Sequence, residues 1–222
     1  MGSKLKTLIL LIVAILVGFI SAEIVTRLVF SANSNILKIN AYQESERGKF
    51  TRYDPTLGWA GKENTKGEFM WIDSRNFVVQ NRYGFRGKEY DFKKNKKRRA
   101  LVLGDSYTWG YGVEEREIYT SVMEERSGNS VEVVNTGVSG YGTDQELLFW
   151  RDTGHKWQPD DVVLMITFLT DLGDNRHDVR YGYPKPLFKI TEGDRLKLTG
   201  IPVPKSEKSF TRARDRVDGS RP

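Results

Sequence analysis

The sequence predicts an α/β protein in which a parallel sheet covered by helices follows an N-terminal transmembrane helix and a segment of short strands and turns. Three observations predict this class. Residues 8–30 are almost continuously apolar, residues 31–98 are polar, aromatic and rich in turn residues, and residues 99–180 alternate short apolar strands with helical patterns. Such alternation is typical of parallel βαβ units. A length of 222 residues allows one domain with accessory segments.

Residues 8–30 are the predicted membrane anchor. About 20 apolar residues are needed for a helix to cross the hydrocarbon layer, and this block reaches that length. Glu23 and Arg27 stand four residues apart, so they can pair on the helix surface. A cleaved signal sequence is the alternative, but residues 20–22 (Ile-Ser-Ala) offer a poor cleavage site, and we therefore favour the anchor.

The charges around the anchor predict its orientation. Lys4 and Lys6 precede the apolar block, and positive residues before a span favour a cytoplasmic N-terminus, here residues 1–7. The expected location is thus the bacterial inner membrane, crossed once, with the remaining chain in the periplasm or outside the cell. The chain contains no cysteine, which excludes disulfides and thiolate metal sites.

The segment 31–98 is predicted to be an extended lead-in that packs on the domain behind it. Its clearest features are turn clusters at residues 54–59 and 81–87, and short strands are expected between the turns. Trp59 and Trp71 can serve either as packing residues or as a ligand platform. We favour packing for both.

A run of basic residues at positions 93–99 contributes to the net charge of +6. Clustered cations can bind nucleic acid or anionic lipid. The run lacks interleaved aromatic residues and leads directly into an apolar strand at residues 100–103, so we interpret it as a solvated turn and expect no nucleic-acid partner.

The α/β region is expected to consist of three strand-and-helix steps. In order, the predicted elements are a strand at 100–103, a helix at 114–126, a strand at 131–135, a glycine-rich loop at 137–142, a helix from Thr143 that ends at Gly154, and a strand at 162–168. Three strands make a small sheet, which looks unfinished. Residues 181–222 are rich in Pro, Gly and charge and are predicted to be an irregular, disordered tail.

Polar residues follow each predicted strand. In open α/β sheets, ligands bind beyond the carboxyl ends of the strands, and Ser106, Gly140 and Thr170 fall there. A serine hydroxyl becomes a nucleophile when a base removes its proton, and the resulting oxyanion needs preorganised donors. The main-chain N–H groups of Ser106 and Gly140 can supply two such donors, because glycine lets the backbone approach a substrate closely.

Two sequence blocks carry a resemblance to a known family. Residues 102–112 (VLGDSYTWGYG) resemble the first block of the GDSL/SGNH hydrolases, and residues 134–140 (VNTGVSG) are similar to the second block. The motif at residues 81–86 (Asn-x-x-Gly-Phe-Arg), together with the N-terminal helix, resembles a bacterial membrane-anchored subgroup. The resemblance covers most of residues 1–180.

The resemblance implies a flavodoxin-like three-layer αβα fold, of which residues 99–180 would form a part. It also implies that Ser106 is the nucleophile and that Gly140 provides an oxyanion-hole N–H. The implied activity is an ester hydrolase or O-acyltransferase that acts on an acylated glycan or lipid. No cofactor and no metal are expected, because no cluster of His and carboxylates has ligand spacing.

The sequence departs from the family pattern in two blocks. Thr170 stands where the third block has an asparagine that donates to the oxyanion, although a threonine hydroxyl can also donate. The fourth block, Asp-x-x-His, is missing, which predicts a truncated chain. His177 is the candidate substitute base, while His155 is expected to be structural. The alternative function is a non-catalytic remnant or an extracytoplasmic binding module that keeps the same crevice.

Overall fold

The computed structural model describes residues 2–30, 45–71, 74–94 and 97–206. The chain divides into two compact units, Met1–Tyr42 and Gln43–Pro222. In the first unit, helix α1 covers Ser3–Phe30. Its residues Lys4–Arg27 are long and apolar enough to cross a membrane. Arg27 Nε donates to Glu23 Oε1 at 2.8 Å, which is the predicted pairing along the helix.

The second unit is built on a parallel sheet of three strands, as predicted. β5 (Arg98–Leu103) lies in the centre, and β6 (Val131–Asn135) and β7 (Asp161–Leu164) pair with it on either side. The central strand is the most deeply buried, since five of its six residues are buried. Apolar residues that fill both faces of a strand are typical of a parallel sheet covered on both sides.

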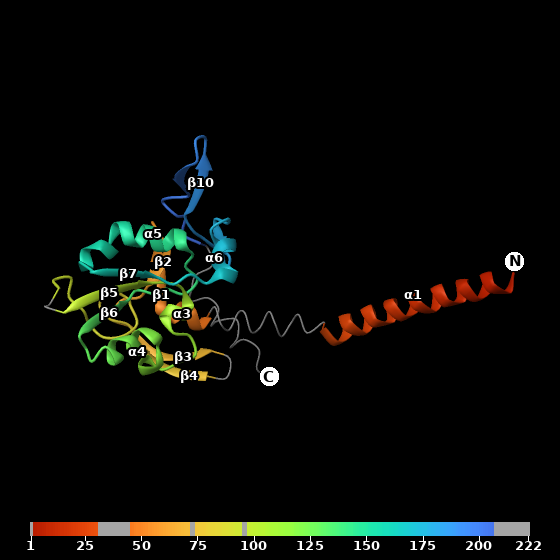
Figure 1. The fold of residues 1–222 in the computed structure, drawn as a ribbon, viewed down its shortest axis with the longest axis horizontal. Coiled ribbons are helices and arrows are strands. Elements are labelled where there is room, and N and C mark those ends of the chain that lie inside the picture. Colours follow the sequence, from red (N-terminus) through yellow and green to blue (C-terminus); the bar gives the residue numbers. More distant parts are fainter. Residues whose placement is uncertain (1, 31–44, 72–73, 95–96, 207–222) are drawn as a thin grey trace, which may run out of the picture. The chain divides into compact units, whose positions relative to one another are not determined.

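Helices connect the three strands. α4 (Tyr119–Arg126) lies between β5 and β6 along the chain, and α5 (Thr143–Asp152) lies between β6 and β7. The two helices lie on opposite sides of the sheet (Figure 1). The helix expected at residues 114–126 is divided, because Ile118 adopts an extended conformation between a 3₁₀ turn (Glu115–Glu117) and α4.

The start of α5 lies where the sequence predicts it. The main-chain N–H of Gly142 donates to Gln145 Oε1 at 3.2 Å, which satisfies a polar group at the helix N-terminus. The end differs by one residue. Thr153 caps the helix, and Gly154 begins a 3₁₀ helix, Gly154–Trp157.

The described residues of the lead-in between 45 and 79 form a short helix and two antiparallel hairpins. The helix covers residues 45–50, and the strands are β1 (Thr51–Asp54), β2 (Gly58–Gly61), β3 (Lys66–Trp71) and β4 (Ser74–Val79). The indole of Trp59 is fully buried and donates to Ser139 O at 2.9 Å, while the Tyr141 hydroxyl donates to Trp59 O at 2.7 Å. Trp59 is therefore a packing residue that ties the lead-in to the loop after β6.

Three cations of the basic run form ion pairs with acids next to the sheet. The pairs are Lys94–Asp160, Arg98–Asp161 and Arg99–Glu132. The guanidinium of Arg99 is buried and also donates to Trp157 O at 2.6 Å. These contacts are those of a turn that leads into a buried strand.

The third predicted strand, residues 162–168, is too long. β7 ends at Leu164, which pairs with Leu103, the last residue of β5, and α6 covers Phe168–Asp174. The Asp171 carboxylate accepts a hydrogen bond from the Thr167 main-chain N–H at 2.8 Å, which favours the start of a helix there. The composition of residues 162–168 favours a strand, but this hydrogen bond at the start of α6 favours a helix from residue 168 onward.

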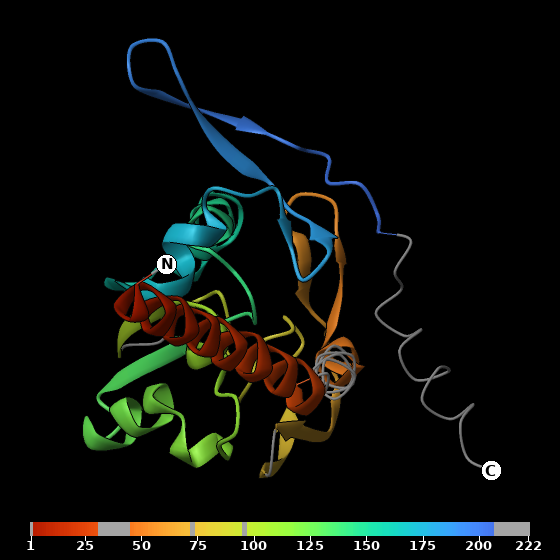
Figure 2. The same cartoon turned by 90° about the vertical axis from the view of Figure 1, so that its right-hand side faces the viewer.

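The prediction of an irregular tail from residue 181 is wrong for residues 181–199, whereas residues 200–206 form no helix or strand. This segment and the residues before it form the hairpins β8 (Val179–Arg180) with β9 (Tyr183–Pro184), and β10 (Leu187–Thr191) with β11 (Arg195–Thr199). The β10–β11 hairpin projects from the unit (Figure 2). Val203 is buried, and its N–H donates to Pro55 O at 2.6 Å, so the segment packs against the lead-in. Residues 207–222 lie outside the described residues.

The end of β7 and the helix α6 expose apolar side chains. The largest exposed fractions are 91% for Leu169 and 73% for Phe168. Because a side chain that is already in water loses little on unfolding, Leu169→Gln is expected to change the unfolding free energy by less than about 0.5 kcal/mol. Urea unfolding of the full chain in detergent measures this, with the buried Leu148→Gln as the contrasting variant. A loss above about 2 kcal/mol for Leu169→Gln would show that its surface is covered.

Candidate functional site

Ser106 is placed by a tight turn at the carboxyl end of β5. It is the first residue of the short helix α3 (Ser106–Trp109), and Asp105 caps this helix by accepting from the Tyr107 N–H at 2.9 Å. Gly104 is required by space, because a Cβ there would lie 2.0 Å from Thr108 Oγ1. The geometry of the turn therefore explains Gly104 and Asp105, but not the serine that follows them.

Asn135, the last residue of β6, holds the second loop against this turn. Its Nδ2 donates to Thr108 O at 2.7 Å, and its Oδ1 accepts from the Gly137 N–H at 2.9 Å. The Val138 N–H in turn donates to Gly104 O at 3.0 Å. The loops that follow β5 and β6 are therefore fixed next to each other, as the sequence predicts.

A pocket of about 270 Å³ opens beside the nucleophile candidate. The described residues that line it are Arg47, Trp71, Ser106, Tyr107, Tyr111, Ser139 and Tyr181. Tyr111 donates from its hydroxyl to Ser139 Oγ at 2.6 Å, which links two of the lining residues. Ser106 thus borders a cavity of the size of a small substrate group.

Gly140 lies in the same loop as Ser139. Its φ is +77°, and a Cβ would lie 2.6 Å from Cε2 of Tyr181, so both the backbone conformation and the space require glycine. Among the described residues, no group accepts a hydrogen bond from the main-chain N–H of Ser106 or of Gly140. Neither N–H is used by another described group, and Gly140 is buried and does not border the pocket.

Thr170 lies on α6 and is not among the residues that line the Ser106 pocket. Its hydroxyl lies 3.3 Å from Thr167 O and 3.4 Å from Asp171 Oδ1, so its proton is directed to groups within the helix region. The structure therefore does not bring the Thr170 hydroxyl to the nucleophile.

Neither histidine borders the pocket. His177 is exposed, and its Nδ1 lies 2.8 Å from Gly173 O, which leaves Nε2 as the nitrogen that can accept a proton. His155 is also exposed, with Nδ1 3.3 Å from Trp150 O. The structure leaves His177 outside the pocket, on the surface near the end of α6.

Several buried carboxyl groups lie around Glu146 on α5. Glu146 is 1% exposed, and neither of its carboxylate oxygens has a hydrogen-bond partner. Burial, together with the negative charges of Asp171, Asp105 and Asp144, raises the pKa of Glu146 from 4.5 to about 8. The Glu146 carboxyl therefore carries a proton at neutral pH.

The motif at residues 81–86 supports the nucleophile turn from behind. Asn81 Oδ1 accepts from the N–H groups of Tyr83 and Phe85, which orders the turn. Arg86 donates from its guanidinium to Gly110 O and, at 2.6 Å, to Val113 O in the segment after α3. Burial lowers the pKa of Arg86 to about 10, so the side chain still carries its positive charge at neutral pH.

Replacing Arg86 by methionine is expected to destabilise the unit by about 3 kcal/mol, because two carbonyls lose charged donors and remain buried. The exposed Arg82→Met is the matched control and is expected to cost much less than Arg86→Met, because water screens its ion pairs. Urea unfolding of both variants gives the comparison. Equal losses would show that the Arg86 contacts with the α3 segment contribute nothing specific.

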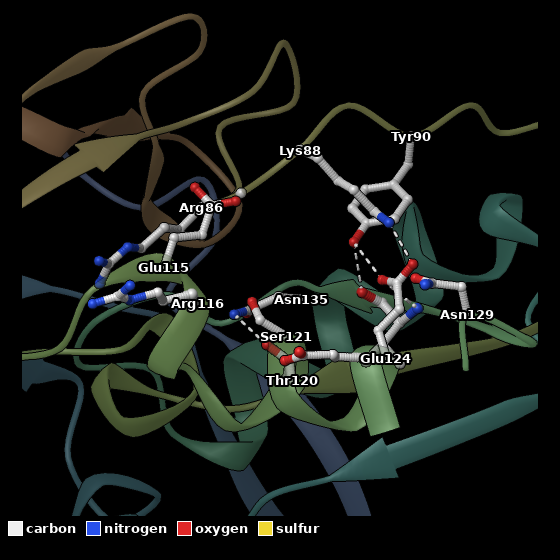
Figure 3. Close-up of a pocket in the computed structure, with 13 residues that line it drawn as sticks. Arg86, Lys88, Tyr90, Glu115, Arg116, Thr120, Ser121, Glu124, Asn129 and Asn135 are labelled. Carbon is white, nitrogen blue, oxygen red and sulfur yellow. Dashed lines mark hydrogen bonds and ion pairs between the residues drawn. The ribbon is translucent and has the colours of Figure 1, made fainter. Parts of the chain in front are cut away.

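A second cavity of about 360 Å³ lies between α4 and the segment after the 81–86 motif (Figure 3). Its walls combine cations and carboxylates, among them the Lys88–Glu124 ion pair. The Tyr90 hydroxyl donates to Val133 O at 2.8 Å. Ser106 does not line this cavity, which is therefore separate from the candidate site.

Sequence reasoning missed most of the pocket walls. Arg47, Tyr107, Tyr111 and Tyr181 were not expected at the site, and Trp71 was assigned to packing. Only the aromatic residues next to the Gly-Asp-Ser turn carried a signal, because a residue that follows the nucleophile closely in sequence must lie near it.

Among the residues that the structure describes, no group of three or more His, Asp or Glu side chains has the arrangement of a metal site. The candidate site consists of Ser106 and a largely aromatic pocket, next to the loop that contains Ser139 and Gly140. Comparison with protein-family models and with curated proteins finds no match to this chain.

Proposed function

We propose that this chain is a membrane-anchored serine ester hydrolase or O-acyltransferase of the GDSL/SGNH type, which acts on an acylated glycan or lipid. The observation that carries the proposal is the placement of Ser106. Its hydroxyl lies at the carboxyl end of the central strand, borders a pocket and has two unsatisfied main-chain donors in the neighbouring loops.

The proposed chemistry has two steps. Ser106 Oγ attacks the ester carbonyl, its proton passes to a base, and the alcohol leaves to give an acyl-enzyme. The main-chain N–H groups of Ser106 and Gly140 stabilise the oxyanion, a type of contact worth about 10²–10³-fold in rate. Water or a sugar hydroxyl then accepts the acyl group, which distinguishes a hydrolase from a transferase.

His177 is the proposed base, in place of the family's Asp-x-x-His. The proposal requires its exposed side chain to move toward the pocket when substrate binds, since geometry in an unliganded site often tightens only in the complex. The Nδ1 contact with Gly173 O supports this role, because it directs the free Nε2 lone pair outward.

The proposed location is the bacterial inner membrane. α1 is the anchor, Lys4 and Lys6 lie on the cytoplasmic side, and the unit Gln43–Pro222 lies in the periplasm or outside the cell.

Hydrolysis of p-nitrophenyl acetate by the full chain in detergent tests the proposal. We expect Ser106→Ala to reduce the rate to the level of the detergent blank and His177→Ala to reduce it by at least about 10²-fold. His155→Ala is the matched control and is expected to retain the wild-type rate. Wild-type and Ser106→Ala rates that are equal would rule out the esterase.

A binding module is the second candidate function. The observation that favours it is that no histidine or carboxylate lines the Ser106 pocket among the described residues. In that case the wild-type chain has no esterase activity, but it binds the ligand of the pocket as tightly as Ser106→Ala does.

A further inference from the structure

The walls of the Ser106 pocket are aromatic and polar rather than aliphatic. The described lining residues comprise four aromatic side chains, two serine hydroxyls and one guanidinium, and no Leu, Ile, Val or Met is among them. Burial of a fatty acyl chain yields about 0.8 kcal/mol per CH₂ only where apolar walls replace water. Aromatic rings also provide apolar surface, but a pocket of about 270 Å³ is small for a ligand site, which favours a short acyl group over a long chain.

Aromatic rings beside hydroxyl groups suit a different ligand. A sugar ring presents C–H groups on its faces, which pack on aromatic rings, and hydroxyls on its edge, which need hydrogen-bond partners. Tyr107 is 70% exposed and Tyr181 is 45% exposed, so both rings are accessible to a ligand. Ser139 accepts from Tyr111 and can donate its own hydroxyl proton into the pocket.

Tyr181 is held at the pocket in an unusual backbone conformation. It follows β8 in the tight turn to β9, and both Tyr181 (φ +54°) and Gly182 (φ +79°) lie in the left-handed region. Asn, Asp and Gly are the residues that such turns favour, whereas a tyrosine there is strained. Strain of about 1–3 kcal/mol that persists in a folded protein often marks a functional residue.

Other contacts fix the Tyr181 ring in place. The Arg47 guanidinium lies 4.6 Å from the centre of this ring and 5.2 Å from that of Tyr183, and the Arg47 side chain is buried. On another side, the ring contacts the position of the missing Cβ of Gly140. The strained turn therefore presents a preorganised ring next to the loop that carries the candidate oxyanion donor.

We propose that the Ser106 pocket binds a sugar residue that carries a short, acetyl-sized O-acyl group, with Tyr181 and Tyr107 as the rings that contact the sugar. The inference rests on the proposed function for the role of the acyl group and selects the glycan over the lipid. The sugar stacks on the exposed rings, and the short acyl group reaches Ser106.

Saturation-transfer NMR tests the proposal. It measures the binding of methyl 6-O-acetyl-β-D-glucopyranoside to the full-length Ser106→Ala variant in detergent. We expect saturation of the acetyl methyl and sugar ring protons. Tyr181→Asn should weaken this binding about tenfold, because the ring is lost, while Tyr181→Phe should remain within about twofold. Monodecanoyl glycerol should not compete with the glycoside.

Stability separates this role from a structural one. Asn is favoured in the left-handed region, so Tyr181→Asn is expected to keep or raise the Tm while it loses sugar binding. A lower Tm with unchanged binding would overturn the role of Tyr181. Tyr107→Ala, an exposed position, provides a second binding test that does not depend on the turn and is also expected to weaken binding.

The test also distinguishes the two proposals. If the wild-type chain binds the sugar but has no esterase activity, the proposed ester hydrolase function is wrong and the proposal that the Ser106 pocket binds a sugar is supported. If the chain has esterase activity but does not bind the sugar, or if monodecanoyl glycerol competes with the glycoside, the ester hydrolase function stands and the sugar-binding proposal is wrong.

Discussion

Replacing Lys185 by methionine is expected to destabilise the unit Gln43–Pro222 by about 3–5 kcal/mol. The Lys185 side chain is fully buried and forms an ion pair with the buried carboxylate of Asp144 at the start of α5. Its ammonium group also donates to Asp174 O at 3.1 Å and to Pro186 O at 3.2 Å. The variant leaves a buried carboxylate without a counter-charge.

The pH dependence of this loss follows from the pKa of Asp144. Burial raises this pKa and the Lys185 charge lowers it, so removal of Lys185 shifts the pKa further upward. A raised pKa in the folded state makes the protein lose stability as pH increases through it. The cost of Lys185→Met is therefore expected to be larger at pH 7 than at pH 4.5.

Urea unfolding of the full chain in detergent, followed by tryptophan fluorescence, measures both quantities. Lys189→Met, at an exposed position on β10, is the matched control and should cost less than about 0.5 kcal/mol. The double variant Lys185→Met/Asp144→Asn should lose less than the sum of the two single changes. Equal effects of Lys185→Met and Lys189→Met would show that the buried pair does not hold the α5 region.

Replacing Glu146 by glutamine is expected to stabilise the same unit by up to about 4 kcal/mol at pH 8. The pKa of Glu146 is about 8 in the folded protein, against an ordinary value of 4.5. Between these values the folded state binds more protons than the unfolded state, so stability decreases as pH rises from about 4.5 to 8. Glutamine has no charge to bury, and this part of the pH dependence disappears.

The measurement is the unfolding free energy of wild type and Glu146→Gln at pH 5, 6, 7 and 8. The two curves should converge toward pH 5 and diverge toward pH 8. Glu125→Gln, at an exposed position on α4, is the control and should follow the wild-type curve. Parallel curves for wild type and Glu146→Gln would show that the Glu146 carboxyl is not protonated in the folded protein.

The parts of the fold that depend on local composition could be predicted from the sequence. The apolar runs of β5 and β6 and the glycine-rich turns after them place Ser106 and Gly140 in neighbouring loops. The signals are local because buried parallel strands need continuous apolar residues, and tight turns need glycine.

The parts that depend on distant contacts could not be predicted. From the sequence alone, Lys185 is expected to be a surface charge. Its burial depends on the contact with Asp144, which lies 41 residues earlier in the chain. The strained turn at Tyr181 leaves no sequence signal, since tyrosine is not a residue that such turns favour. The β10–β11 hairpin did carry a signal, because Phe188 and Ile190 alternate with polar residues, but the high charge of the segment obscured it.

Mass spectrometry of the full chain after incubation with a fluorophosphonate tests the central claim most directly, because the reagent modifies only a serine that a base has activated. The proposed function predicts one adduct, on the peptide that contains Ser106, and its absence in Ser106→Ala. An unmodified Ser106, in a sample where an added serine hydrolase is fully labelled, would contradict the claim that Ser106 is a nucleophile.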